Sequence, residues 1–154
     1  MTVIGVISDT HGLLRAEAVE ALRKSDHIIH AGDIGGPEIL HRLRTIAPVT
    51  AVRGNVDGRA WARGVPYADV IAVDRISIYV LHILADLDLK PEAAGFGVVV
   101  YGHSHVPKQE LRSSVLYFNP GSAGPRRFQL PVTVGRLRIE GGSVSGEIVD
   151  LAVD

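Results

Sequence analysis

The chain has 154 residues, 46% of them hydrophobic and 21% charged, which is the size and composition of one globular domain over residues 1–154. A formal net charge of −1 gives no support for general nucleic-acid binding, and the absence of cysteine excludes disulfides, thiolate metal ligands and cysteine nucleophiles. Because no apolar stretch reaches the roughly 20 residues of a membrane span and no signal-peptide pattern is present, we expect a cytoplasmic protein that does not bind membranes.

Strands and helices are predicted to alternate in the first third of the chain. Short apolar runs typical of buried strands alternate with segments whose apolar residues follow helical spacing. In chain order these segments are strand Val3–Ile7, helix Leu14–Leu22, strand His27–Ala31, helix Pro37–Arg44 and strand Val49–Val52. This order predicts a βαβαβ unit with right-handed crossovers.

After residue 55 the pattern changes to mainly strands. A hairpin is predicted across Asp74-Arg75, a short helix at Pro91–Ala94, and only strands after His105. The expected strands are Val70–Val73, Ile76–Leu81, Val98–Tyr101, Gln109–Arg112, Val115–Phe118, Val132–Arg138 and Ser143–Leu151. Early βα alternation followed by hairpins predicts an α/β fold of two sheets stacked face to face, with helices outside.

Metal-ligand side chains directly follow five of these apolar runs. The segments are Asp9-Thr10-His11, Gly32-Asp33, Gly54-Asn55, His82 and Gly102-His103-Ser104-His105. Because open α/β sheets bind ligands beyond the carboxyl ends of their strands, we expect the seven oxygen and nitrogen donors of these segments to gather at one edge. Such a set is typical of a two-metal hydrolytic centre.

Taken one at a time, these segments differ in how strongly they indicate a metal site. The paired histidines His103 and His105 have no obvious packing role, whereas a lone strand-end histidine such as His82 is more often a hydrogen-bonded core residue. Gly-Asp and Gly-Asn turns are common, and Asp9 has the alternative role of capping a helix. Their joint occurrence outweighs these alternatives. Of the other histidines, His27 and His41 are expected to be structural or exposed. His30 is expected to pack, with support of the site near Asp33 as the alternative.

The charge balance of such a centre indicates its substrate. Two divalent cations bring four positive charges while Asp9 and Asp33 return two negative ones, so the centre stays positive and suits a small phosphate ester. Donors without sulfur favour Mn²⁺, Fe²⁺, Co²⁺, Ni²⁺ or Zn²⁺ over Ca²⁺. Water between two such ions is activated for in-line attack on phosphorus. Exposed apolar edge strands are compatible with a homo-oligomer.

The ordered motifs Asp-x-His, Gly-Asp, Gly-Asn, His and Gly-His-x-His resemble those of the calcineurin-like metallophosphoesterase superfamily. The chain length, the His30–Asp33 context and the Asn119-Pro120-Gly121-Ser122 segment are similar to small YfcE-like phosphodiesterases. The resemblance implies a four-layer αββα sandwich of two mixed sheets. It also implies a dinuclear centre, chiefly of Mn²⁺, with a metal-bridging hydroxide as nucleophile.

The resemblance also implies a role for each matching residue. Asp9, His11 and His105 would bind one metal, Asp33 would bridge, and Asn55, His82 and His103 would complete the second. The catalytic residues it implies are Asp33, Asn55 and His103.

Two positions depart from the family pattern. Many members have a histidine after Gly-Asn that is thought to protonate the leaving group, whereas Gly54-Asn55 is followed by Val56 and Asp57. Small YfcE-like members commonly lack this histidine too. Loss of a general acid typically costs about 10²–10⁴-fold in rate, so esters with poor leaving groups should suffer most. Ile83 stands after His82 where many relatives have glycine, which leaves the ligand intact and narrows access.

Several further residues are candidates for contacting substrate. Arg126 and Arg127 could clamp a phosphate bidentately, although an exposed basic pair is usually only solvated. The Asn119–Ser122 turn either directs backbone N–H groups at an anion or is a plain Pro-Gly β-turn. The weaker candidates are Arg53 and Arg59, together with Trp61, which lines a cleft or packs. The expected cleft walls are Asn55–Tyr67, Ile83–Lys90 and Pro120–Phe128.

We therefore expect a metal-dependent phosphoesterase that prefers phosphodiesters, because a complete ligand set accompanies the missing histidine acid. The alternatives are a phosphomonoesterase, a cyclic-nucleotide phosphodiesterase, or a catalytically weak scaffold that resembles the retromer subunit of this fold. That scaffold has degraded metal-site histidines. Competent residues at all seven ligand positions favour the enzyme.

Overall fold

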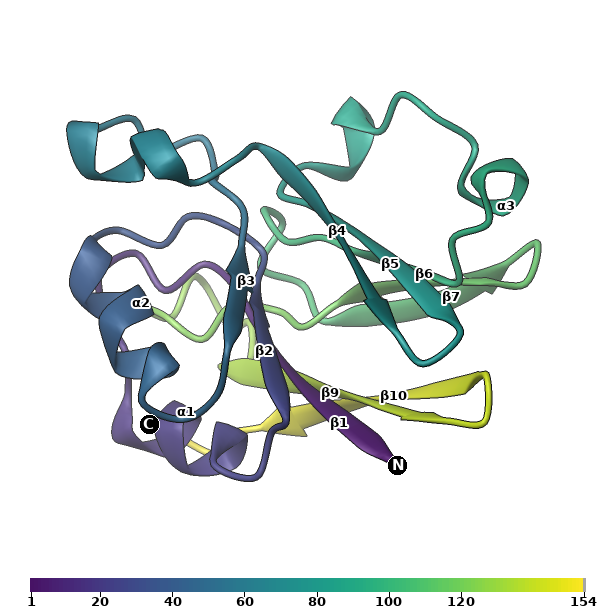
Figure 1. Cartoon of the computed structure of the whole chain (residues 1–154). Coiled ribbons are helices and arrows are strands. Elements are labelled where there is room, and N and C mark those ends of the chain that lie inside the picture. Colours follow the sequence, from purple (N-terminus) through teal and green to yellow (C-terminus); the bar gives the residue numbers. More distant parts are fainter. Residues whose placement is uncertain (154) are drawn as a thin grey trace.

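A computed structural model describes residues 1–153, which form two five-stranded sheets (Figure 1). The first sheet has the order β10-β9-β1-β2-β3 and the second the order β4-β5-β6-β8-β7. The strands are β1 (Thr2–Ile7), β2 (His27–His30), β3 (Val49–Ala51), β4 (Ala68–Val73), β5 (Ile76–Leu81), β6 (Val98–Val100), β7 (Lys108–Arg112), β8 (Val115–Asn119), β9 (Thr133–Glu140) and β10 (Ser143–Asp150).

Parallel pairing brings the ends of five strands to one edge of the molecule. In the first sheet Ile7 of β1 pairs with His30 of β2, and His30 pairs with Ala51 of β3, so the three strands end in register. In the second sheet Val80 of β5 pairs with Val100 of β6. The loops that follow these strands therefore emerge side by side in each sheet.

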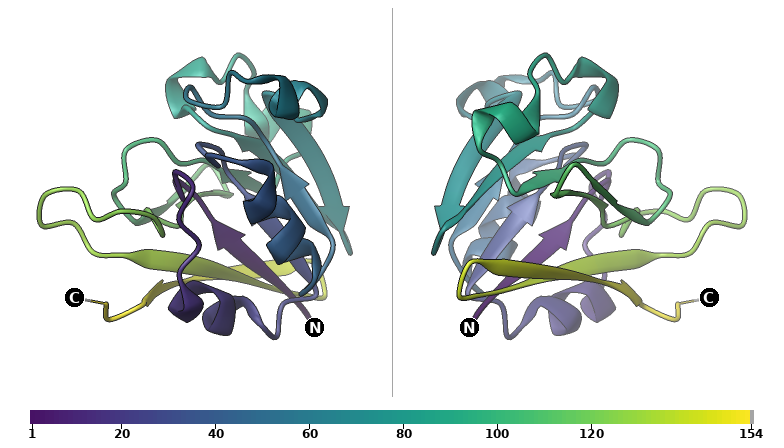
Figure 2. Two further views of the ribbon diagram at one scale, coloured as in Figure 1. Left: turned by 90° about the vertical axis from the view of Figure 1, so that its left-hand side faces the viewer. Right: turned by 90° about the vertical axis from the view of Figure 1, so that its right-hand side faces the viewer.

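Helices and helical turns cover the outer face of each sheet (Figure 2). On the first sheet these are α1 (Ala16–Leu22) and α2 (Pro37–Arg44), whose Leu22 and Leu43 belong to the same core cluster as Ile28. On the second sheet the cover is thinner, because it consists of the short helix α3 (Pro91–Ala94) and the 3₁₀ turn η2 (Leu84–Asp86). A further 3₁₀ turn, η1 (Ala60–Gly64), precedes β4.

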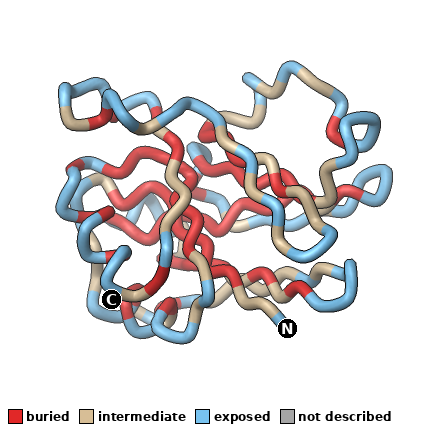
Figure 3. Tube along the Cα trace, in the orientation of Figure 1, coloured by how far each residue is buried: buried red, intermediate tan, exposed pale blue. Residues whose placement is uncertain are grey.

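The main core lies between the two sheets, along the strand segments that Figure 3 shows as buried. Ile4 and Ile29 from the first sheet belong to one buried cluster with Val80, Val100 and Phe118 from the second. This alternation of inward-facing side chains is what stacks two sheets. The predicted sandwich of two mixed sheets with helices outside is confirmed.

Most predicted elements agree with the structure to within two residues. The first helix begins at Ala16 and not at Leu14, because Arg15 is still extended, with φ −72° and ψ 147°. The sequence did not predict the turns η1 and η2. Across residues 1–153, the helices are all too short or too polar to cross a membrane.

Candidate metal centre

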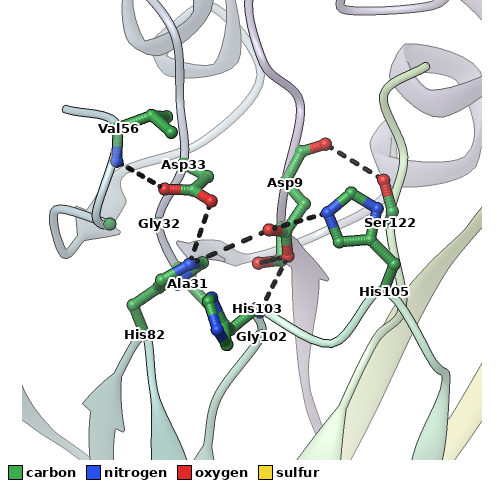
Figure 4. Close-up of polar contacts among 12 residues, drawn as sticks. Asp9, Ala31, Gly32, Asp33, Val56, His82, Gly102, His103, His105 and Ser122 are labelled. Carbon is green, nitrogen blue, oxygen red and sulfur yellow. Dashed lines mark hydrogen bonds and ion pairs between the residues drawn. The ribbon is translucent and has the colours of Figure 1, made fainter. Parts of the chain in front are cut away.

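The loops after β1, β2, β5 and β6 bring two groups of metal-ligand side chains together (Figure 4). The first group is Asp9, His11 and His105, and the second is Asp33, His82 and His103. Within each group the ligand atoms all lie within 4.8 Å of one another. Each group combines residues from both sheets, so six of the seven predicted ligands meet at the seam between the sheets.

In the first group, Oδ1 of Asp9 faces two imidazole nitrogens. It lies 3.4 Å from Nε2 of His105 and 3.8 Å from Nε2 of His11. The same two nitrogens are 3.4 Å apart. A carboxylate oxygen and two ring nitrogens therefore converge on one small volume.

In the second group, Oδ2 of Asp33 lies 3.1 Å from Nε2 of His82. The same oxygen is 3.7 Å from Nε2 of His11, which belongs to the first group. Asp33 thus stands between the two groups, where a carboxylate shared by two cations would have to be.

Unpartnered buried atoms test whether metal ions fit these groups. Nδ1 of His82 lies 2.7 Å from the carbonyl oxygen of Ala31, so it carries the proton when the ring is neutral. Nε2 then presents a lone pair to the Asp33 carboxylate, and it has no hydrogen-bond partner despite being buried. Oδ1 of Asp9 is likewise buried without a partner. Buried polar atoms are normally satisfied, so these two call for a cation between them and their neighbours.

The electrostatics of these side chains agree with this need for positive charge. Burial works against ionisation of Asp33, but His82 and the Val56 N–H outweigh it and lower the pKa of Asp33 to about 2. Burial lowers the pKa of His82, but the nearby Asp33 carboxylate outweighs burial and raises it. Burial raises the pKa of Asp9 and lowers that of His105. The raised pKa of His82 therefore reflects the negative charge that Asp33 places beside its ring.

The backbone at these residues is held in an uncommon conformation. Five candidate ligands have left-handed φ: Asp9 (55°), His11 (47°), Asp33 (54°), His103 (74°) and His105 (65°). Non-glycine residues adopt this conformation rarely, and clusters of such residues mark functional sites. The strained loops are tied to the ligands, since Oδ2 of Asp9 accepts hydrogen bonds from Ser8 Oγ at 2.7 Å and from the His103 N–H at 3.1 Å.

Two glycines of the motifs are needed for close approach. A Cβ at Gly54 would collide with the carboxylate and backbone nitrogen of Asp33. A Cβ at Gly102 would collide with Ser8 Oγ and lie 2.8 Å from Asp9 Oδ2. Each glycine therefore leaves room for a carboxylate that another loop delivers.

Asn55, the seventh predicted ligand, is exposed beside the second group. With Gly54 and His82 it lines a cavity of about 370 Å³.

Sequence reasoning missed the role of Asp57. Its buried carboxylate accepts hydrogen bonds from the backbone N–H groups of Ile34 (2.9 Å), Gly35 (3.0 Å) and Gly54 (2.9 Å). Asp57 thereby fastens the loop of Asp33 to the loop of Asn55. An aspartate two residues after a Gly-Asn turn is typical of such backbone hydrogen bonding, which is the signal that could have found it.

His30 and Asn119 also hold the loops. His30 is fully buried and accepts a hydrogen bond from the Gly32 N–H at 3.1 Å, so its Nε2–H donates to Thr10 Oγ1 at 3.0 Å. Thr10 in turn donates to the Ile34 carbonyl at 2.7 Å. The side-chain amide of Asn119 donates to the Gly102 carbonyl at 3.1 Å. His30 therefore supports the site, as one of its predicted roles required.

The predicted turn at Asn119–Ser122 borders the site, but its polar groups are used within the protein. Ser122 Oγ donates to the Asp9 carbonyl at 3.0 Å, and the Gly121 N–H donates to Asn119 Oδ1 at 2.9 Å. The structure thus favours the plain turn over an anion-binding one.

The structure gives Arg126 a role other than the predicted phosphate clamp. Arg126 donates to the carbonyls of Leu130 (3.3 Å) and Val153 (2.7 Å), so it braces the chain terminus. Arg127 is exposed, and it stays the clamp candidate of the pair. Trp61 is partly buried and packs against the core cluster that includes Ile39 and Leu43 of α2. Of the other two histidines, His41 is exposed, and His27 forms a hydrogen bond with Thr50 at 2.8 Å.

Comparison with known proteins agrees with the motifs. The family profile described as Calcineurin-like phosphoesterase superfamily domain matches residues 1–142. A probable metallophosphoesterase of Methanothermobacter thermautotrophicus is 37% identical over 163 residues, covering 96% of this chain and 91% of the relative. YfcE of Escherichia coli, named a phosphodiesterase, is 31% identical over 108 residues, covering 65% of this chain and 58% of its own length.

Solved structures show the same fold. The structure of E. coli YfcE, described as a phosphoesterase, aligns with a TM-score of 0.71 at 22% identity, covering 97% of this chain and 100% of YfcE. Vps29 of Entamoeba histolytica, solved in complex with Zn²⁺, aligns with a TM-score of 0.75 at 21% identity, covering 97% and 99%. From its family profile and its relatives, the chain belongs to the calcineurin-like phosphoesterase superfamily.

Proposed function

We propose that this protein is a metal-dependent phosphodiesterase with a dinuclear centre. The observation that carries the proposal is the pair of buried, unpartnered atoms Asp9 Oδ1 and His82 Nε2, which face other donors across spaces suited to cations. The names of relatives, metallophosphoesterase and phosphodiesterase, support the same reaction class.

The ligand assignment follows the two groups. Asp9, His11 and His105 would hold one ion, Asp33 would be shared, and Asn55, His82 and His103 would complete the second. Oxygen and imidazole donors favour Mn²⁺, with Fe²⁺, Co²⁺, Ni²⁺ or Zn²⁺ as the other candidates. Two bound divalent ions would supply Lewis acidity toward a phosphate oxygen and would activate water.

Within this centre, three residues are proposed to act closest to the reaction. Asp33 would hold both ions at a fixed separation, and Asn55 would contribute a neutral oxygen that adds no negative charge. His103 is exposed at the rim, so its ring can reach both the second ion and a substrate.

The proposed preference for diesters is supported by the relatives named phosphodiesterase, and Val56 limits it to particular leaving groups. Its side chain has no proton to give a leaving group, and it is 50% exposed beside Asp33. A catalyst without a general acid performs best on esters whose leaving group needs no protonation. A monoesterase or cyclic-nucleotide phosphodiesterase is the alternative within the same chemistry.

The test is hydrolysis of bis-p-nitrophenyl phosphate by the full chain loaded with Mn²⁺. Asp33→Ala and His103→Ala should abolish hydrolysis, whereas the half-buried control Asp69→Ala and the exposed control His41→Ala should retain it. Parallel assays with p-nitrophenyl phosphate and with 2′,3′- and 3′,5′-cyclic nucleotides separate the alternatives. Activity retained in either site variant would refute the centre.

A scaffold without hydrolysis is the rival function, because Vps29 shares the fold. Metal content alone does not separate the two, since a Vps29 has been solved with Zn²⁺. Ester hydrolysis does separate the two functions. A metal-replete chain that hydrolyses none of these esters would favour the scaffold.

A further inference from the structure

The cavity beside Asn55 extends the candidate centre in one direction. It has a volume of about 370 Å³ and continues from Asn55 and His82 along β5 toward η2. Ligand pockets in proteins span roughly 300–1,000 Å³. A cavity at the small end of that range has the size of one compact organic group.

Two tyrosines and two aliphatic side chains give this cavity its apolar walls. Tyr67 and Tyr79 stand in the wall with Leu81 and Ile83. Tyr79 is braced by the edge of Phe96, with ring centroids 5.3 Å apart. Flat, fixed aromatic faces of this kind suit a planar ring.

Arg53 fixes the Tyr67 ring at the end of the cavity nearest Asn55. Its guanidinium lies 4.6 Å from the ring centroid, and its Nε–H donates to the Val65 carbonyl at 3.0 Å. Tyr67 is nevertheless 68% exposed, so much of the ring stays open to a ligand. The Tyr67 ring is thus held in place while the cavity beside it stays open.

Two carboxylates stand on the η2 side. Asp86 and Asp88 line the cavity and are exposed, and neither forms an ion pair with any residue of 1–153. They can accept hydrogen bonds from N–H donors of a ligand. They also repel a second phosphate.

We propose that this cavity takes the nucleoside that remains on phosphorus when a nucleotide phosphodiester is cleaved, with the ester phosphate at the metal centre and the other ester group as the leaving group. The inference rests on the proposed function and specifies its substrate class. A nucleobase offers planar faces that stack on tyrosine and N–H donors that match free carboxylates. One nucleoside is also the size of group that the cavity admits.

A cationic group such as choline fits less well, although aromatic walls and carboxylates attract such groups too. The Arg53 guanidinium lies over one face of Tyr67, where it repels a second cation, and the other face of this exposed ring is left for a nucleobase. Within 1–153 Arg53 forms no ion pair, so its charge is not cancelled by a neighbouring acid.

The experiment measures nucleoside binding without turnover. The ¹⁵N-labelled full chain, loaded with diamagnetic Zn²⁺, is titrated with adenosine, guanosine, cytidine and uridine, and separately with choline. Saturable amide shifts are expected at Ala68 and Ile83, with no comparable response to choline. Tyr67→Ala should weaken binding about tenfold, in the range found for lost base–aromatic stacking.

Matched variants make the outcome specific. Tyr67→Phe keeps the ring and should bind as the unmodified chain does, and Leu111→Ala, an exposed position on β7 outside the cavity, should have no effect. Absence of saturable shifts, shifts elsewhere, or tighter binding of choline would overturn the nucleoside assignment. In that case, hydrolysis of bis-p-nitrophenyl phosphate would still support the proposed phosphodiesterase function. Nucleoside binding without hydrolysis of any ester would instead overturn the proposed function.

Discussion

The backbone N–H of Val56 donates a hydrogen bond of 3.0 Å to Oδ1 of Asp33. The residue that replaces the family's histidine therefore still contacts the Asp33 carboxylate, through its main chain. Since any residue but proline can make this bond, the side chain at position 56 is free to change without disturbing Asp33.

Val56→His should restore a general acid. We expect the rate for diesters with poor leaving groups, such as alkyl esters, to rise by as much as about 10²-fold, the lower end of general acid catalysis. The p-nitrophenyl diester should gain little, because its leaving group needs no proton. The measurement is kcat for both esters, with Val56→Gln as a control of similar size. An equal gain for both esters would argue against proton donation.

Asp57→Ala should destabilise the domain by about 3 kcal/mol, because three buried N–H groups lose a charged acceptor. Asp57→Asn, which keeps one acceptor oxygen, should cost less. Urea unfolding of the metal-free chain checks both values. If the two variants unfold at the same urea concentration as the unmodified chain, Asp57 does not fasten the loops.

Gly54→Ala should lower metal affinity about 10–100-fold, as do other changes next to metal ligands. The new Cβ would push on the Asp33 carboxylate. Gly58→Ala is the matched control in the same loop, because its Cβ would meet nothing within 4 Å. Calorimetric titration with Mn²⁺ compares the two, and equal affinities would show that Asp33 does not bind the ion.

Burial lowers the pKa of His30 from 6.5 to about 3. The folded state thus disfavours the charged form, so the unfolded chain binds the extra proton first. The contribution of His30 to the free energy of unfolding should be fully present above pH 6.5 and should be lost as the pH falls toward 3. The loss from this group amounts to at most about 5 kcal/mol. His30→Gln, which keeps one donor and one acceptor, should show a flatter decline. Unfolding free energies across this range test the difference, and parallel curves would contradict it.

The sequence predicted the sandwich and the meeting of the ligand loops because both depend on local patterns. Apolar runs define the strands, and parallel strands end at a common edge. His103 and His105 follow β6 directly, so their place was readable once β6 was recognised.

Other features depend on contacts that no local pattern encodes. The role of Asp57 requires that its loop lie against Ile34 and Gly35, some twenty residues away in the chain. Arg126 is one of two adjacent arginines, and only the position of the Val153 carbonyl distinguishes it from Arg127. The turns η1 and η2 lack a periodic apolar pattern.

The division of each ligand group between the two sheets also limits which parts of the chain could be made separately. The first group needs residues from Asp9 to His105, and the second from Asp33 to His103. A fragment that ends before β6 would retain every ligand of the first sheet and complete neither group. During synthesis, neither group can therefore be completed until about two thirds of the chain has been made.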